Sequence, residues 1–199
     1  DGTCLTLYFN NSIILTAPNA PVITNVIATN PTDCGLTDGT IDITAAGGSG
    51  SYEYSIDGGN DWTNTTGSFT GLDASGNPYE IRVRNAADNS CEVSYPDVTL
   101  TDKIAPIIAS VTSSNVTDCG VIDGTINITA SSGQGTVEYS IDNGTTWSQS
   151  GTFTGLTAGT YQIRVRNIDG TCVVTDTDVI ITAPVQPAVT NVTSTDPSN

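Results

Sequence analysis

Apolar and polar residues alternate along short segments of this chain, which is the pattern of strands that bury one face. The alternation is clear in Thr40-Ile41-Asp42-Ile43-Thr44 and returns in Thr125-Ile126-Asn127-Ile128-Thr129. No window of about ten or more residues shows the 3.6-residue period of an amphipathic helix. The pattern therefore predicts an all-β protein built from short strands.

The same order of segments occurs twice, at a fixed spacing. Cys34 and Cys119 are 85 residues apart, and so are Trp62 and Trp147. A period of this length indicates a tandem array of small domains. The predicted divisions are residues 1–20 as the end of a preceding repeat, 21–105 and 106–186 as two complete repeats, and 187–199 as the first strand of a following repeat.

Each repeat contains segments for about seven strands, separated by Gly- and Asn-rich turns, which favours an immunoglobulin-like antiparallel β-sandwich. Tyr79 and Tyr161 follow Leu72 and Leu156 at the approach to a late strand. This arrangement predicts a tyrosine corner, in which the phenol hydroxyl bonds back to the preceding backbone. The final strands are expected at residues 92–100 and 173–182.

Composition excludes several classes of function. The formal net charge of −16 disfavours nucleic acid and anionic membrane surfaces as partners. The chain has no histidine, the commonest general base, so we do not expect an enzyme. No apolar run approaches the length of a membrane-spanning helix, and the start does not read as a signal peptide. We expect a targeting segment outside this sequence.

The five cysteines fall into two positions of the repeat, an early one and a late one. Cys34 and Cys119 are early, whereas Cys91, Cys172 and Cys4 are late. We predict disulfides Cys34–Cys91 and Cys119–Cys172 within the repeats, with the partner of Cys4 in a preceding repeat. Free buried thiols are the alternative, and the absence of histidine and of Cys-x-x-Cys pairs disfavours a metal site. Disulfides would indicate an oxidising compartment.

Charged residues alternate on neighbouring predicted strands. The outward side chains on two strands of the first repeat are Arg82 and Arg84 on one, and Glu53 and Asp57 on the other. We predict cross-strand ion pairs between these two sets, worth about 0.2–1 kcal/mol each. The corresponding set in the second repeat is Arg164, Arg166, Glu138 and Asp142.

Calcium and sugars are two classes of ligand that a purely structural interpretation must be compared with. Calcium candidates are the loop carboxylates Asp33, Asp38, Asp118, Asp123 and Asp102. Hard cations need several such oxygens, but no stretch has the calcium-loop spacing, and Asp-Gly is a common turn pair. Trp62 and Trp147 could stack on sugars if exposed, although an aromatic residue at the same place in each repeat is more often a packing residue.

The order of motifs resembles the SprB-type repeat of large gliding-motility adhesins and related bacterial surface proteins. The motifs are Cys-Gly-x-x-Asp-Gly-Thr-Ile, Tyr-Ser-Ile-Asp-x-Gly with a Trp, Phe-Thr-Gly-Leu-x-Ala-Gly-Thr-Tyr-x-Ile-x-Val and Asp-Gly-x-Cys, and residues 119–172 match most fully. The resemblance implies an extracellular filament or stalk on the bacterial cell surface, used in adhesion and gliding motility. It supplies no binding residue.

We therefore expect a structural and adhesive spacer whose partners are neighbouring repeats, other copies in a fibre, or surface polysaccharide. A carbohydrate-binding accessory region of a secreted enzyme and a calcium-rigidified stalk are the alternatives.

Overall fold

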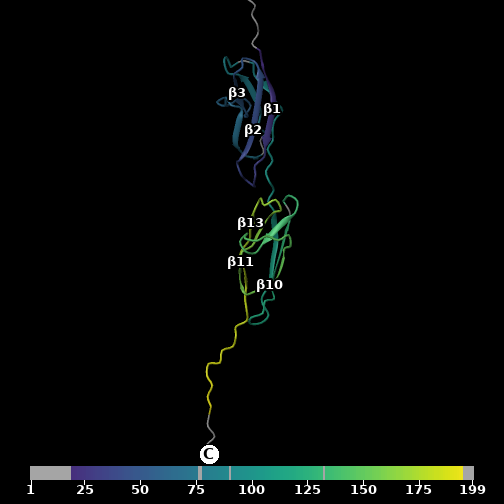
Figure 1. Cartoon of the computed structure of the whole chain (residues 1–199), viewed down its shortest axis with the longest axis vertical. Helices are drawn as coiled ribbons and strands as arrows, with labels where there is room; N and C mark the ends of the chain where they lie inside the picture. Colours follow the sequence, from purple (N-terminus) through teal and green to yellow (C-terminus); the bar gives the residue numbers. More distant parts are fainter. Residues whose placement is uncertain (1–18, 76–77, 90, 132, 195–199) are drawn as a thin grey trace, which may run out of the picture. The chain divides into compact units, whose positions relative to one another are not determined.

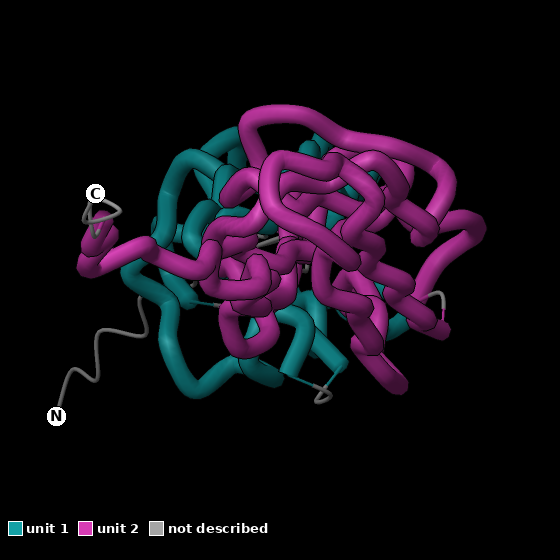
Figure 2. The backbone as a smooth tube through the Cα atoms, turned by 90° about the horizontal axis from the view of Figure 1, so that it is seen from below, with its two compact units in different colours: residues 1–30, 37–101 teal, residues 31–36, 102–199 magenta. Residues whose placement is uncertain are grey.

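The computed structural model describes residues 19–75, 78–89, 91–131 and 133–194. The predictions for residues 1–18 and 195–199, including that for Cys4, lie outside this range. The chain divides into two compact units, which Figure 2 distinguishes by colour. Unit 1 comprises residues 1–30 and 37–101, and unit 2 comprises 31–36 and 102–199. Nothing in the described segments forms a helix with the length and apolar character needed to cross a bilayer.

Unit 1 is a sandwich of two three-stranded antiparallel sheets (Figure 1). One sheet has the order β1-β2-β4 and the other β3-β5-β6. This arrangement is that of the immunoglobulin fold, in which strands A, B and E face strands C, F and G. Here β1, β2 and β4 correspond to A, B and E, and β3, β5 and β6 correspond to C, F and G. The strands are β1 (Pro21–Thr29), β2 (Gly39–Gly47), β3 (Tyr52–Ser55), β4 (Ser68–Leu72), β5 (Arg82–Asn85) and β6 (Val93–Ser94).

The core of unit 1 lies between these sheets. Ile41 and Ile43 of β2 are 0% and 3% exposed, whereas the intervening Asp42 is exposed. Ile81 and Val83 face them from the other sheet and are equally buried. The predicted alternation is therefore confirmed, because successive side chains of a strand point to opposite faces.

Unit 2 repeats this architecture. Two of its sheets have the strand orders β10-β8-β7 and β13-β12-β9. A further antiparallel pair joins β11, which precedes β12 in the chain, to β14, which follows β13. The strands are β7 (Ile107–Ser114), β8 (Gly124–Ser131), β9 (Val137–Ser140), β10 (Thr152–Leu156), β11 (Gly159–Tyr161), β12 (Arg164–Asn167), β13 (Val174–Thr175) and β14 (Val179–Ile181). Its core holds Ile126, Ile128, Ile163 and Val165, which occupy the positions of their unit 1 counterparts.

The predicted tyrosine corners are present in both units. The Tyr79 hydroxyl donates to the carbonyl of Asp73, and the Tyr161 hydroxyl donates to the carbonyl of Thr157, each at 2.8 Å. These bonds hold the chain where it approaches β5 in unit 1 and β12 in unit 2.

The last predicted strand is shorter than expected in each unit. In unit 1 only Val93–Ser94 and a bridge between Tyr79 and Val98 pair within residues 92–100. Pro96 lies between them and has no N–H for a ladder bond. In unit 2 the interruption falls at Asp176, whose carboxylate accepts from the next backbone N–H.

Within residues 21–186 the units differ from the predicted repeats in two segments. Residues 102–105, predicted as the end of the first repeat, belong to unit 2. The loop between β1 and β2, residues 31–36, belongs to unit 2 although both flanking strands belong to unit 1. The chain thus passes into unit 2 after Asn30, returns after Leu36 and passes again after Thr101. The loop 31–36 contains Cys34.

Candidate functional site

Unit 2 contains a disulfide between Cys34 and Cys172, whose Cα atoms are 5.2 Å apart. The predicted pairs Cys34–Cys91 and Cys119–Cys172 are therefore wrong. The early cysteine of the first repeat bonds to the late cysteine of the second, across 138 residues of sequence.

Strand topology explains why the predicted pairing fails. Cys119 lies on the β7–β8 loop, at one end of the unit 2 sandwich. Cys172 follows β12, whose last residue Asn167 pairs with Val137 at the start of β9, the opposite end. The eight residues of β8 separate these ends by about 26 Å at ~3.3 Å per residue. A disulfide requires Cα atoms within about 7 Å, so the two cysteines of one repeat cannot meet.

Hydrogen bonds align the two bonded segments. The Asp33 Oδ1 atom accepts from the backbone N–H of Cys34 at 2.7 Å and from that of Cys172 at 2.6 Å. Asp102 accepts from the N–H of Gly35 at 3.0 Å, and the Cys34 Sγ lies 3.1 Å from the carbonyl oxygen of Lys103. The backbone N–H groups of Cys34, Gly35 and Cys172 therefore have carboxylate acceptors on both sides of the disulfide.

The connector that leads into β7 is also held within unit 2. Lys103 forms an ion pair with Asp169, and the pKa of that carboxyl lies well below its usual range because Lys103 and Thr171 donate to it. The buried Asn167 donates through Nδ2 to the carbonyl of Ile104 at 3.0 Å. Asn85 of unit 1 donates in the same way to Asn19. Each sandwich thus anchors its own incoming chain through a buried asparagine.

These asparagines are absent from the residues predicted above, although the strand pattern contains a signal for them. Ile81, Val83 and Asn85 alternate along one strand, so the side chain of Asn85 must share the buried face. A polar residue at a predicted core position requires hydrogen-bond partners. The same Arg-Val-Arg-Asn sequence precedes the second unit's late loop.

Four of the five carboxylates that were candidates for calcium accept backbone or hydroxyl hydrogen bonds, namely Asp33, Asp102, Asp118 and Asp123. Asp33 and Asp102 bind the disulfide loop as described above. Asp118 accepts from the N–H of Cys119, and Asp123 accepts from Thr117 through both the N–H and the hydroxyl, which lowers the Asp123 pKa. The donor atoms of Asp33, Cys34 and Cys172 lie within 4.8 Å of one another, but the two sulfurs are bonded to each other and offer no thiolate.

Two of the predicted ion pairs form. Arg84 binds Glu53 and Arg166 binds Glu138, with Nη2–Oε2 distances of 2.6 and 2.7 Å. The other two pairings are wrong: Arg82 binds Glu92, and Arg164 donates to the Asn143 side chain.

Asp57 and Asp142 instead close their own turns, which explains their absence from the arginine pairs. Asp57 accepts from the Ser55 hydroxyl and from the N–H groups of Asn60 and Asp61. Asp142 accepts from Ser140 and from both the N–H and the hydroxyl of Thr146. The Thr146 hydroxyl is the main cause that lowers the Asp142 pKa to about 2.

The two tryptophans pack against Arg84 and Arg166, the arginines that form the predicted ion pairs. The guanidinium carbon of Arg84 lies 4.2 Å from the centre of the Trp62 ring, and that of Arg166 lies 4.0 Å from the Trp147 ring. One face of each indole is therefore covered by a cation that a carboxylate also binds. This favours the packing interpretation over an open sugar platform.

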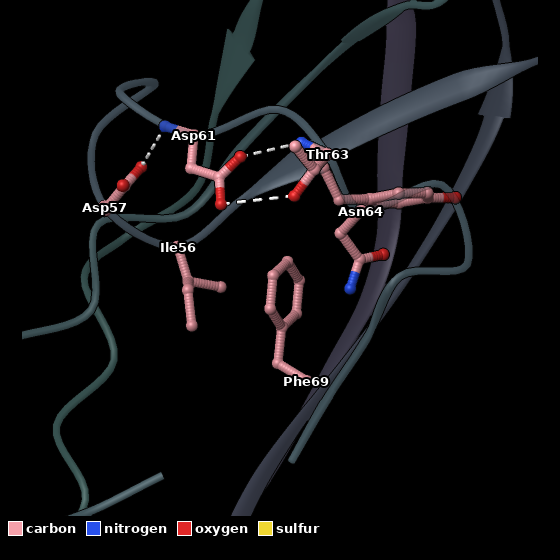
Figure 3. Close-up of a pocket in the computed structure, with 7 residues that line it drawn as sticks. Ile56, Asp57, Asp61, Thr63, Asn64 and Phe69 are labelled. Atoms are coloured by element: carbon pink, nitrogen blue, oxygen red, sulfur yellow. Dashed lines mark hydrogen bonds between the residues drawn. The ribbon is translucent and has the colours of Figure 1, made fainter. Parts of the chain in front are cut away.

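A depression of about 270 Å³ in unit 1 lies beside the Asp57 turn (Figure 3). Ile56 and Phe69 contribute its apolar lining, and Asp61 lies above them. Both Asp61 oxygens accept from Thr63, through its N–H and its hydroxyl. The carboxylate is thus engaged in a local turn.

Comparison with known protein families finds a match for one segment of the chain. Residues 25–61 match the SprB repeat family. They run from β1 through the disulfide loop and β2 to the Asp57 turn. This segment is a SprB-type repeat. The disulfide loop and the Asp57 turn are therefore parts of the repeat itself, and the second repeat carries the same motifs 85 residues later.

One similar solved structure is the C-terminal 282-residue fragment of intimin in complex with the intimin-binding domain of the translocated intimin receptor. The sequences are 19% identical, with a TM-score of 0.41. The match covers 80% of this chain and 64% of the fragment, so the chain spans less than two thirds of that fragment. A search of curated protein sequences finds no match.

Proposed function

We propose that this chain is a structural and adhesive segment of a long protein on the bacterial cell surface, and that its repeats serve in gliding motility. The SprB-type repeat at residues 25–61 supports this proposal. The disulfide supports an extracellular location, because such bonds persist in oxidising compartments. The charge of −16 is compatible with a protein that avoids nucleic acid and anionic membranes. We propose no enzymatic role.

The observation that carries this proposal is the long covalent loop. The Cys34–Cys172 bond encloses the chain between those residues, which includes β2 to β6 of unit 1 and β7 to β12 of unit 2. Tension applied at the two ends passes through the sulfur atoms and bypasses the enclosed residues. Even if both sandwiches unfold, the enclosed residues cannot add to the end-to-end length of the stretched chain. A stalk under load would benefit from such a limit on its extension.

Single-molecule stretching of the 199-residue chain tests the mechanical role. Without reductant, the enclosed residues add nothing to the final length. With reductant, the extended length increases by about 470 Å, at ~3.4 Å for each of the 138 residues. The Cys34→Ser variant is the control and should extend fully with or without reductant. An oxidised wild-type chain that already reaches the full length would contradict the mechanical role.

The partners that we propose are neighbouring repeats of the array and surface polysaccharide. Polysaccharide contacts would have to use surfaces other than the Trp62 and Trp147 faces that the arginines cover. A carbohydrate-binding accessory region of an enzyme is the weaker proposal for this reason. A calcium-rigidified stalk is also weaker, because Asp33, Asp102, Asp118 and Asp123 already bind protein donors.

A further inference from the structure

Cys119 occupies the same local environment as Cys34. The N–H of Cys119 donates to Asp118 at 2.7 Å, as that of Cys34 donates to Asp33. The Cys119 Sγ lies 3.1 Å from the carbonyl oxygen of Pro184, and the Cys34 Sγ lies at the same distance from that of Lys103. The loop is therefore already in the conformation that Cys34 has in its disulfide.

The covalent state of the two cysteines differs. Cys34 is bonded to Cys172, whereas Cys119 is an exposed thiol with no disulfide partner among the described residues. Asp118 Oδ1 accepts one backbone N–H, whereas the equivalent Asp33 Oδ1 accepts a second one from the partner cysteine. The Cys119 loop thus has the geometry of the Cys34 loop without its partner.

The late cysteine has a distinctive backbone in both repeats. Cys172 has φ of 57° and Cys91 has φ of 55°, in the left-handed region that residues other than glycine rarely adopt. The same conformation at both late positions indicates that the partner half of the site is also built into each repeat. Early and late halves are therefore both present in each of the two repeats.

We propose that Cys119 is a covalent docking site for a further SprB-type repeat, whose late cysteine bonds to it as Cys172 bonds to Cys34. The repeats of an array would then be joined by successive overlapping disulfides, each linking one repeat to the next. The inference goes beyond the proposed function and does not depend on adhesion.

The bond forms by two thiol–disulfide exchange steps with a small disulfide such as oxidised glutathione. The Cys119 thiolate attacks one sulfur of glutathione disulfide and releases a glutathione thiolate. The thiolate of the late cysteine then attacks the Cys119 sulfur of the mixed disulfide and releases the second glutathione thiolate. Two protein thiols are oxidised, and one glutathione disulfide is reduced to two thiols.

The test uses the whole chain with one repeat added, made by inserting a second copy of residues 106–186 after Gln186. The chain is refolded in reduced and oxidised glutathione, alkylated with iodoacetamide and mapped by mass spectrometry without reduction. We expect a Cys34–Cys172 bond and a bond from Cys119 to the copied Cys172. Alkylation of Cys119 should fall at least tenfold relative to the 199-residue chain, while the copied Cys119 stays alkylated and serves as an internal control.

Two results with the added repeat would overturn the proposal. One is a Cys119 that is alkylated as in the original chain while Cys34–Cys172 forms. The other is a Cys119–Cys119 dimer in place of the intramolecular bond.

A second variant tests the register without any added repeat. In the 199-residue chain, Cys34→Ser leaves Cys172 without its partner. We expect both Cys119 and Cys172 to be alkylated, because they lie at opposite ends of one sandwich. A Cys119–Cys172 bond would mean that the register runs within repeats, and the proposal would fail.

Discussion

The loops 31–36 and 116–121 share the sequence Thr-Asp-Cys-Gly but have different covalent states. In the first, Cys34 is bonded to Cys172, and the loop belongs to unit 2. In the second, Cys119 has the same hydrogen bond to its preceding aspartate and remains a thiol. The local sequence thus determines the shape of the loop, whereas the presence of a late cysteine beside it determines the bond. The early cysteine of the first repeat therefore obtains its disulfide partner from the second repeat.

The largest expected difference between the two loops concerns stability. Cys34→Ser should lower the free energy of unfolding by up to about 5 kcal/mol, because a closed loop of 138 residues restricts the unfolded chain. Cys119→Ser should change it by less than about 0.5 kcal/mol. Chemical denaturation of both variants, with and without reductant, measures this.

Reductant should destabilise the wild type to the level of Cys34→Ser and leave that variant unchanged. Equal losses for the Cys34→Ser and Cys119→Ser variants would remove the distinction between the loops.

The buried asparagines provide a second comparison, with a smaller effect. Asn85→Ala and Asn167→Ala should each destabilise their unit by about 1–3 kcal/mol, because the carbonyl of Asn19 or Ile104 loses its donor. The Asn85 side chain also accepts from the N–H of Ser49, whereas the buried Asn167 Oδ1 has no partner among the described residues. We therefore expect the larger loss for Asn85→Ala in thermal unfolding. A larger loss for Asn167→Ala would contradict this account of the two anchors.

The smallest expected effect concerns the Asp142 turn at low pH. Its folded pKa of about 2 lies below the ordinary aspartate pKa of 3.8, so the carboxylate stabilises unit 2 above about pH 4 and loses that contribution as the pH falls toward 2. Thr146→Val should raise the Asp142 pKa in an NMR titration, because the Thr146 hydroxyl donor is lost. Thr145→Val is the matched control, since its hydroxyl donates to the backbone carbonyl of Asp142. An unchanged pKa in Thr146→Val would exclude this hydroxyl as the cause.

The equivalent turn in unit 1 lacks the hydroxyl that Thr146 supplies in unit 2. Asp61 stands where unit 2 has Thr146, so Asp57 receives a backbone donor there but no hydroxyl. Burial raises the Asp57 pKa, and the N–H of Asp61 and the hydroxyl of Ser55 outweigh it, so the pKa is still lowered. Asp61→Thr should lower the Asp57 pKa further.

Much of the candidate site could be placed from the sequence, but its connections could not. The repeat spacing identified Cys34 and Cys119 as equivalent early positions and Cys172 as a late position. The alternation of side chains placed Arg84 opposite Glu53. The pairing error came from treating each repeat as a closed unit. The immunoglobulin-like strand order already implied that the two cysteines of a repeat lie at opposite ends, because the loop after the first strand and the loop after the strand of the Arg-Val-Arg-Asn sequence are at opposite ends of the sandwich.

The two β-sandwiches, their cores and their tyrosine corners follow from the amino-acid sequence, because strand alternation and turn residues act over a few neighbouring positions. The bond between Cys34 and Cys172 and the place of residues 31–36 in unit 2 depend instead on the folded arrangement of the strands. The physical reason is that a disulfide depends on a separation of a few ångströms between Cα atoms, and 138 residues of intervening chain leave that separation to the fold.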